Sequence, residues 1–217
     1  MSLVLSIVGL VILGLLGLFL YIAYFVRKLG TPTKGAKIDN SVRPNEALVV
    51  IDVQEDFTRN TGKNAFDPSV RDAALDEINR MISAARKAGH DVVFVRNVFR
   101  DWPIIQLMKL VAGGIGTPGR EELKFDRKLE IRDSSVFEKS IGDTFSSPDF
   151  ENFLAKRDIG RLTLVGLDAC HCVQLTAKGA LSRGYEVEIR EPAILTATPA
   201  KWPSLKQDLT RAGAAIA

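Results

Sequence analysis

An uncharged apolar run near the start of the sequence limits what the first part of this chain can fold into. No charged residue occurs from Leu3 to Val26, and Leu, Ile, Val and Gly dominate the run. As a helix, a run of this length exceeds the roughly 20 residues that cross a bilayer. It therefore predicts one transmembrane helix, which we place within residues 1–28 as a membrane anchor.

The charges that flank this run predict its orientation. A cleaved secretory signal carries basic residues before a shorter apolar core, whereas only Ser2 follows Met1 here. Basic residues come after the run instead, at Arg27, Lys28, Lys34, Lys37 and Arg43. Because positively charged flanks stay in the cytoplasm, we expect a retained single-pass anchor with its N-terminus outside and the rest of the chain in the cytoplasm.

Composition narrows the possible partners of the remaining chain. Hydrophobic residues make up 46% and charged residues 25%, as in globular proteins. A net charge of +3 is too small to argue for nucleic acid, and the basic excess follows the apolar run, where anionic lipid headgroups attract it. The two cysteines are expected to be reduced thiols in a cytoplasmic domain. We therefore expect a small-molecule substrate and no nucleic acid.

Strands and helices alternate through the rest of the chain. Residues 29–45 are rich in Gly, Pro, Lys and Asn without an apolar period, which predicts a linker. Predicted strands lie at 47–53, 91–96, 134–138, 162–166, 185–190 and 214–217. Predicted helices begin at Pro68, Ile104, Pro148, Cys172 and Pro203. This alternation predicts one domain at 46–217, an α/β three-layer Rossmann-like sandwich with a mostly parallel sheet and helices on both faces.

Three of the predicted strands are followed by residues that can carry chemistry. Asp52 follows the first strand, Lys139 the strand near 136, and Cys170 and Cys172 the strand at 162–166. Reactive groups collect beyond the carboxyl ends of such strands. A cysteine nucleophile needs a base for its proton and positive charge for the anion, which an aspartate and a lysine can supply. Structural roles explain the same residues as well: an aspartate after a strand often forms a turn, a lysine before a loop is usually solvated, and a cysteine at a helix start often packs as a small apolar residue.

Several segments resemble, in the same order, the isochorismatase-like cysteine hydrolases, a group that includes nicotinamidases and N-carbamoylsarcosine amidases. They are ALVVIDVQEDF at 47–57, GTPG at 116–119, VFEKSIGDTF at 136–145 and VGLDACHCVQLTAKGALSRGYEVEI at 165–189. The similarity spans about residues 45–217. It implies the fold predicted above and a cysteine-dependent hydrolase of a small amide- or carbamoyl-type C–N bond.

The resemblance also implies roles for particular residues. Asp52 matches the family's acid/base carboxylate, Lys139 its charge-stabilising lysine and Cys172 the nucleophile that forms a thioester. A cis peptide bond is implied at Leu167–Asp168, and the backbone N–H groups of Asp168 and Cys172 are implied to form the oxyanion hole. The presence of Cys172 favours the amidase side of the family, and no cofactor is implied.

Two departures from the family pattern restrict the substrate. Ala169 and Cys170 stand where relatives often carry Thr-Asp. A nicotinamidase-type metal site needs an Asp and two His after the first strand, and this chain has only His90 and His171, neither of them there. We therefore expect no metal and disfavour nicotinamide as the substrate.

Substrate contacts are expected from Phe57, Trp102 and Phe145. The apolar residues between positions 102 and 108 suggest a wall or lid, although a helix packed on the core, on lipid or on a second subunit fits them as well. Arg100 and Arg120 are candidates for holding a substrate carboxylate.

Other hypotheses remain open for the Cys170-His171-Cys172 stretch. A zinc site there, with Asp168, lacks the second distant arm of structural zinc sites. A Cys170–Cys172 disulfide would make the protein a thiol redox sensor. An inactive membrane-anchored binding or scaffold protein is a further alternative on the same fold. We expect Cys170 to pack in the turn, His171 to be a bystander, and the protein to be a homo-oligomer.

Overall fold

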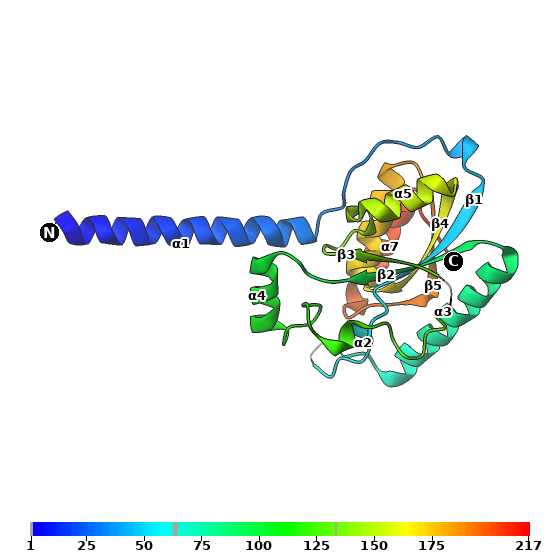
Figure 1. The fold of residues 1–217 in the computed structure, drawn as a ribbon, viewed down its shortest axis with the longest axis horizontal. Helices are drawn as coiled ribbons and strands as arrows, with labels where there is room; N and C mark the ends of the chain where they lie inside the picture. The colour runs from blue at the N-terminus through cyan, green and yellow to red at the C-terminus, as the bar shows by residue number, and fades with distance from the viewer. Residues whose placement is uncertain (1, 63–64, 133) are drawn as a thin grey trace.

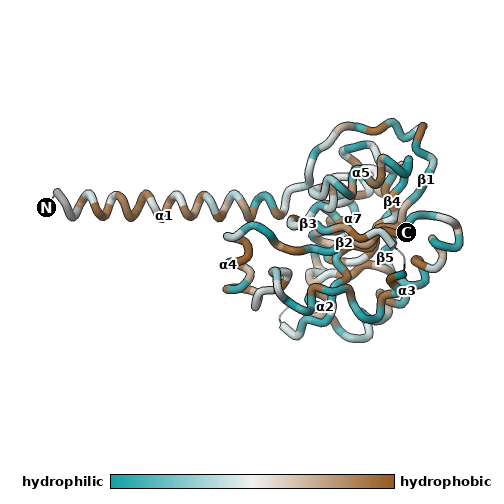
Figure 2. Tube along the Cα trace, in the orientation of Figure 1, coloured by the Kyte–Doolittle hydropathy of each residue, from teal (hydrophilic) through white to brown (hydrophobic). Residues whose placement is uncertain are grey.

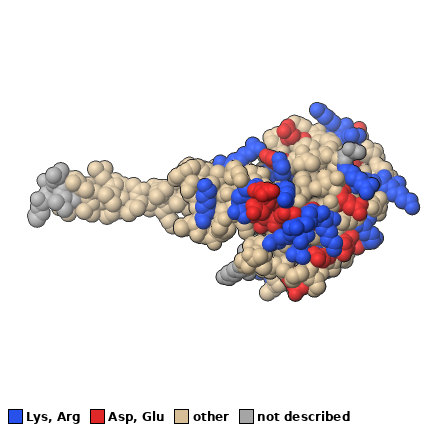
Figure 3. Space-filling model, turned by 60° about the horizontal axis from the view of Figure 1, so that its bottom comes forward, with Lys and Arg blue, Asp and Glu red and all other residues tan. Residues whose placement is uncertain are grey.

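The computed structural model describes residues 2–62, 65–132 and 134–217, so Met1 of the predicted anchor lies outside the described residues. Helix α1 (Ser2–Leu29) projects from an α/β domain (Figure 1). Its segment Leu5–Leu29 is long and apolar enough to cross a membrane. Figure 2 shows the apolar residues along it. Among the described residues on the face shown in Figure 3, the projecting part of α1 carries no charged side chain, whereas the domain intersperses both signs.

Within the described residues, six strands form one sheet in the order β3-β2-β1-β4-β5-β6. All neighbouring strands pair in parallel. The strands are β1 (Asn45–Ile51), β2 (Asp91–Asn97), β3 (Ser135–Lys139), β4 (Ile159–Leu167), β5 (Glu186–Leu195) and β6 (Ala215–Ile216). The predicted α/β class with a parallel sheet is confirmed.

Helices cover both faces of this sheet because the central strands are apolar on both sides. Along β1, Val49 and Ile51 point into one core, while Leu48 and Val50 point into the other. Helix α3 covers the second core, whereas α5, α6 and α7 cover the first. The helix bounds are α2 (Glu55–Thr58), α3 (Pro68–Ala88), α4 (Trp102–Val111), α5 (Pro148–Lys156), α6 (Gln174–Ser182) and α7 (Trp202–Arg211).

Strand β5 is longer than predicted. It runs to Leu195, beyond the predicted end at Arg190, and its pairing with β4 is irregular. Leu164 pairs with Ile189, but Gly166 pairs with Ile194, so the intervening residues of β5 bulge out of the ladder. Bulged residues leave the alternating pattern, which explains why the sequence pattern predicts a strand only as far as Arg190.

The order of the strands creates a crevice at the carboxyl ends of β1 and β4. The chain moves from β1 outward to β3 and then returns to place β4 beside β1. Ligands bind at such topological switch points. Gly166, at φ +108°, lets β4 approach β1 closely, since a Cβ there would lie 2.1 Å from the carbonyl oxygen of Ile51.

The predicted linker is irregular, but it is not a free tether. We call residues 33–38 the strap. Both the backbone N–H and the Oγ1 hydroxyl of Thr33 donate to Oδ2 of the buried Asp143 at 2.7 Å. The buried Arg183 donates to the Thr33 carbonyl at 3.1 Å, and the N–H of Ile38 donates to the Arg183 carbonyl at 2.8 Å. The strap therefore joins α1 to the domain at fixed points.

Loss of the strap is expected to destabilise the domain. Burial raises the pKa of Asp143, and the Thr33 hydrogen bonds oppose this rise. A fragment of residues 40–217 should therefore unfold with a free energy at least about 2 kcal/mol below that of a fragment of residues 30–217, because a buried acceptor loses its donors. Urea unfolding followed by circular dichroism measures the difference.

The matched controls are single substitutions in the longer fragment. Thr33→Val removes one donor to Asp143 and should lose part of the stability. In the full chain the Thr31 hydroxyl donates to the Arg27 carbonyl, which the longer fragment lacks, so Thr31→Val should lose little stability there. Equal unfolding midpoints for the two fragments would contradict a structural role for the strap.

Candidate active site

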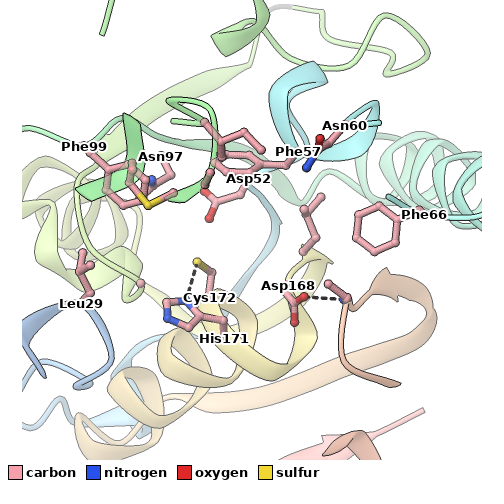
Figure 4. A pocket seen from close by; sticks show the side chains of 16 residues that line it. Leu29, Asp52, Phe57, Asn60, Phe66, Asn97, Phe99, Asp168, His171 and Cys172 are labelled. Atoms are coloured by element: carbon pink, nitrogen blue, oxygen red, sulfur yellow. Dashed lines mark hydrogen bonds between the residues drawn. The ribbon is translucent and has the colours of Figure 1, made fainter. Parts of the chain in front are cut away.

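The carboxyl ends of three strands bring a carboxylate, an ammonium and a thiol together. Asp52 follows β1, Lys139 ends β3, and Cys172 lies in the turn after β4. Lys139 Nζ donates to Asp52 Oδ2 at 2.6 Å, and both side chains are buried. Figure 4 shows the Cys172 sulfur pointing toward the Asp52 carboxylate. The parallel topology explains this meeting, since all these strands end at the same edge of the sheet.

The lysine is held by three acceptors. Besides Asp52, Lys139 Nζ donates to Asn97 Oδ1 at 3.3 Å and to the Ile141 carbonyl at 3.2 Å. An ammonium has three N–H donors, so every one is used. Burial opposes the charge of Lys139, but its interactions with Asp52 and Cys172 outweigh this effect, and the pKa of Lys139 is raised. Lys139 is therefore a fixed cation.

One oxygen of the Asp52 carboxylate has no hydrogen-bond partner among the described residues. Asp52 has a φ of +55°, an uncommon value for a residue with a side chain, and its N–H donates to the Val95 carbonyl at 2.8 Å. Oδ2 accepts from Lys139, whereas the buried Oδ1 has no hydrogen-bond partner among the described residues. Burial raises the pKa of Asp52 even though Lys139 opposes the rise. This oxygen is suited to accept a proton.

The turn that carries the thiol is shaped by Asp168. The Leu167–Asp168 peptide bond is cis, and one turn of π-helix, Ala169–Val173, leads into α6. The Asp168 carboxylate accepts from Cys170 N, Thr196 Oγ1 and Ala197 N. The backbone N–H groups of Asp168 and Cys172 belong to this turn, directly before α6. Such donors at a helix start can hold an anion.

The two residues before Cys172, His171 and Cys170, differ in their contacts. His171 lines the cavity, and its Nδ1 lies 3.4 Å from Cys172 Sγ (Figure 4). Burial lowers the pKa of His171, and Lys139 lowers it further. His171 therefore contacts the thiol, while its expected lack of a catalytic role stays a prediction. Cys170 is a free thiol that donates to the Thr198 carbonyl at 3.6 Å and packs against the core.

A cavity of about 370 Å³ lies in front of the thiol. Its polar lining comes from Asp52, Asn60, Asn97, Asp168, His171 and Cys172. Apolar side chains make up the rest, including the rings of Phe57, Phe66 and Phe99 (Figure 4) together with Leu29, Met108 and Ile115. The cavity therefore suits a ligand that is largely apolar and carries one polar group.

Comparison with known proteins identifies the family. The isochorismatase domain model matches residues 46–217. The chain belongs to the isochorismatase family. The isochorismatase family protein YddQ of Bacillus subtilis, described as uncharacterized, is 25% identical over 156 residues, which cover 70% of this chain and 78% of that protein.

Solved structures share the isochorismatase-family fold. Pyrazinamidase of Pyrococcus horikoshii, in complex with zinc, is 21% identical with a TM-score of 0.67, covering 80% of this chain and 99% of that chain. Nicotinamidase from Bacillus subtilis is 23% identical with a TM-score of 0.68, over the same shares of 80% and 99%. At these identities, the likeness concerns the fold alone.

Of the three predicted substrate contacts, only one lines the isochorismatase-family cavity. Phe57 lies in the cavity wall. Phe145 is buried in the core beneath the Arg183 guanidinium, 4.5 Å from its ring centre, and packs against Phe150. Trp102 is 66% exposed and does not line the cavity. The predictions for Phe145 and Trp102 are corrected accordingly.

The two arginines proposed to hold a substrate carboxylate already have protein partners. Arg120 binds the buried Asp56 through two nitrogens, at 2.8 and 3.0 Å, and Asp56 also accepts from Gly116 N at 2.7 Å. Arg100 pairs with Glu138 at 2.8 Å. Asp56 and Arg120 thus hold the glycine-rich turn at 113–119 against the cavity.

Sequence reasoning missed Asn97 and Gln54. Asn97 ends β2, lines the cavity and accepts from Lys139. The fully buried Gln54 exchanges two hydrogen bonds with the Asn97 backbone, which fixes the ends of β1 and β2. The signal available was a polar residue directly after a strand, as for Asp52.

The residues do not fit a nicotinamidase-type metal site. Zinc takes His, Cys and carboxylate ligands, and the described residues contain no group of three or more such side chains placed to hold an ion. Asn60 and Phe66 line the cavity from the segment after α2. His90 lies near Glu46, at the opposite end of β1 from Asp52. The mechanism proposed for this chain uses no metal.

Proposed function

We propose that this isochorismatase-family protein is a membrane-tethered cysteine hydrolase of amide- or carbamoyl-type C–N bonds. The observation that carries the proposal is the buried Asp52–Lys139 pair next to the partly buried Cys172 at the cavity, with Asp52 Oδ1 unpaired among the described residues. The apolar helix α1 supports the tethering, and the basic residues at its end favour a cytoplasmic domain. The expected homo-oligomer stays a prediction.

The first stage forms a thioester. Asp52 takes the thiol proton as Cys172 Sγ bonds to the substrate carbonyl carbon. The oxyanion accepts hydrogen bonds from the backbone N–H groups of Asp168 and Cys172. The C–N bond then breaks, and Asp52 returns the proton to the departing amine. Lys139 keeps its charge throughout and stabilises the anions beside it.

The second stage regenerates the thiol. A water molecule gives a proton to Asp52 and attacks the thioester carbonyl, and the C–S bond breaks to release the acid. The proton returns from Asp52 to the sulfur. Burial raises the pKa of the Cys172 thiol, and the charge on Lys139 opposes this rise. The resting pair is thus a neutral thiol beside a carboxylate, which requires proton transfer during attack.

The pH dependence of kcat/KM tests this assignment. A protonated Asp52 cannot accept the thiol proton, so activity should be lost as pH falls through the pKa of Asp52, which burial raises above 3.8. Activity should persist through neutral pH because the pKa of Lys139 is raised above 10.5. An acid limb at or below 3.8 in the full-length chain, with its circular dichroism unchanged, would contradict the role of Asp52.

A substrate screen tests the proposed function itself. Small amides, carbamoyl compounds and lactams are incubated with the full-length chain in detergent micelles, and the released amine or ammonia is measured. We expect turnover of at least one class. If no class is hydrolysed by the wild-type chain, the inactive scaffold becomes the better explanation.

A further inference from the structure

Helix α4 lies at the face of the domain from which α1 leaves. In Figure 1, α4 lies beside the end of α1 and runs across its direction. Lys28, in the last turn of α1, pairs with Asp101 at 3.4 Å, directly before α4. If α1 crosses a bilayer, α4 therefore lies close to the membrane surface and along it.

Three of the five exposed side chains of α4 are large and apolar, and no described residue covers them. Trp102 is 66% exposed, Leu110 83% and Val111 66%. Gln106 and Lys109 are exposed on the same helix. Exposed apolar groups of this kind mark interaction sites, and a short helix that mixes them with a lysine suits a membrane–water interface.

Along the direction of α1, helix α4 lies at the level of the C-terminal end of the apolar segment. Tyr21 and Tyr24 are exposed near the end of α1, and Lys28 follows them. Tyrosine and tryptophan are enriched at this level of a membrane. Because Asp101 binds Lys28, the neighbouring Trp102 lies at the same level. Trp102 thus has a place at the interface instead of in the substrate cavity.

The catalytic cavity reaches both helices. Leu29, the last residue of α1, lines it, and its carbonyl accepts from Gly142 N at 3.2 Å. Met108 of α4 and Ala112 line the same cavity. One side of α4 therefore faces the cavity while the other side is exposed.

We propose that α4 lies in the membrane–water interface and that the cavity receives from the lipid phase an amide that carries an apolar chain. The proposal rests on the amide hydrolysis proposed above and specifies its substrate class. The chain lies among Phe57, Phe99 and Met108, and the amide carbonyl reaches Cys172. Hydrolysis then yields a fatty carboxylic acid and an amine or ammonia, with water as the co-reactant.

Fluorescence quenching tests the placement of α4 without relying on activity. The full-length chain is reconstituted in phosphatidylcholine vesicles with or without bromine on the acyl chains. The emission of the wild type minus that of Trp102→Phe isolates Trp102, while Trp202, 9% exposed, serves as an internal reference. We expect bromine to reduce the Trp102 emission by roughly half or more, because this residue lies at the lipid interface.

Surface variants sharpen the quenching test. The Leu110→Ser/Val111→Ser double variant should weaken quenching of Trp102, whereas Val70→Ser, at a 58% exposed position on α3, should not. Equal Trp102 emission in both vesicles overturns the proposal. If quenching is absent and Leu110→Ser also converts a dimer into a monomer in detergent, α4 binds a second copy of the chain instead.

Protection of the thiol tests the substrate class, again without turnover. In a Cys170→Ala background, N-ethylmaleimide labels Cys172 in the presence of straight-chain primary amides from acetamide to dodecanamide. The protecting concentration should fall roughly tenfold or more from butanamide to dodecanamide, because burial of each added methylene favours binding. Equal protection by short and long amides overturns the proposed substrate class.

Failure of the two proposals can be told apart. Protection by long amides with quenching of Trp102, but no hydrolysis, leaves the lipid-facing cavity standing and removes the proposed function. Hydrolysis of short amides without quenching of Trp102 supports the proposed function and removes the lipid-facing cavity.

Discussion

Replacement of Cys172 by alanine is expected to abolish amide hydrolysis, with a loss of kcat on the order of 10⁴-fold or more, because no nucleophile remains for the thioester. Asp52→Asn should lower kcat by about 10²–10⁴-fold through loss of the base. Ammonia release measures both effects. Intact-mass spectrometry of a slow substrate should show an acyl adduct on the wild type and none on Cys172→Ala.

Cys170→Ala is the matched control for this prediction. Cys170 is also a partly buried thiol in the same turn, but it bonds to the Thr198 carbonyl on the loop after β5. The variant should keep the activity of the wild type and the acyl adduct. Turnover by Cys172→Ala, or equal losses for both variants, would remove Cys172 from the mechanism.

Replacement of Lys139 by methionine is expected to impair both stability and activity. Asp52 would become an unpaired buried carboxylate, and Asn97 Oδ1 and the Ile141 carbonyl would lose a donor. Breaking a buried pair in this way costs about 3–5 kcal/mol. The pKa of Asp52 should rise further, which moves the acid limb of kcat/KM to higher pH. Denaturant unfolding and the pH profile measure the two effects.

Two controls separate charge from packing in this experiment. Lys128→Met removes the partner of Asp76, a pair 2.8 Å long whose side chains are 33% and 67% exposed, together with a hydrogen bond to the Asp72 carbonyl. It should change stability by about 1 kcal/mol. The Asp52→Asn/Lys139→Met double variant should regain stability relative to Lys139→Met alone. A single Lys139→Met variant as stable as the wild type would contradict the burial of a charged pair.

The meeting of the three catalytic candidates could be predicted because topology alone requires it. Asp52, Lys139 and Cys172 each lie at or after the end of a strand, and parallel strands end at one edge. The side chain of Lys139 crosses the end of β2 to reach Asp52, which explains the contact with Asn97. Local sequence patterns that locate the strand ends are therefore enough to predict which side chains gather at this edge.

The environment of single aromatic residues could not be predicted in this way. Phe145 and Trp102 have similar apolar character, yet one lies under the Arg183 guanidinium in the core and the other is exposed. Which of them is buried depends on partners distant in the chain. The same holds for the strap, because Thr33 and Asp143 lie 110 residues apart and nothing local connects them.

If α1 spans a bilayer as proposed, the docked strap also limits how the domain can move relative to that bilayer. A flexible tether of the same six residues would have a root-mean-square end-to-end distance of roughly 13 Å, so the domain could turn and sample the solution. With Thr33 bonded to Asp143 and Leu29 in the cavity wall, the domain instead tilts together with α1. Bilayer thickness influences the tilt of a spanning helix, so in the proposed arrangement it would also change the immersion of α4 and the access of lipid-borne amides to the thiol.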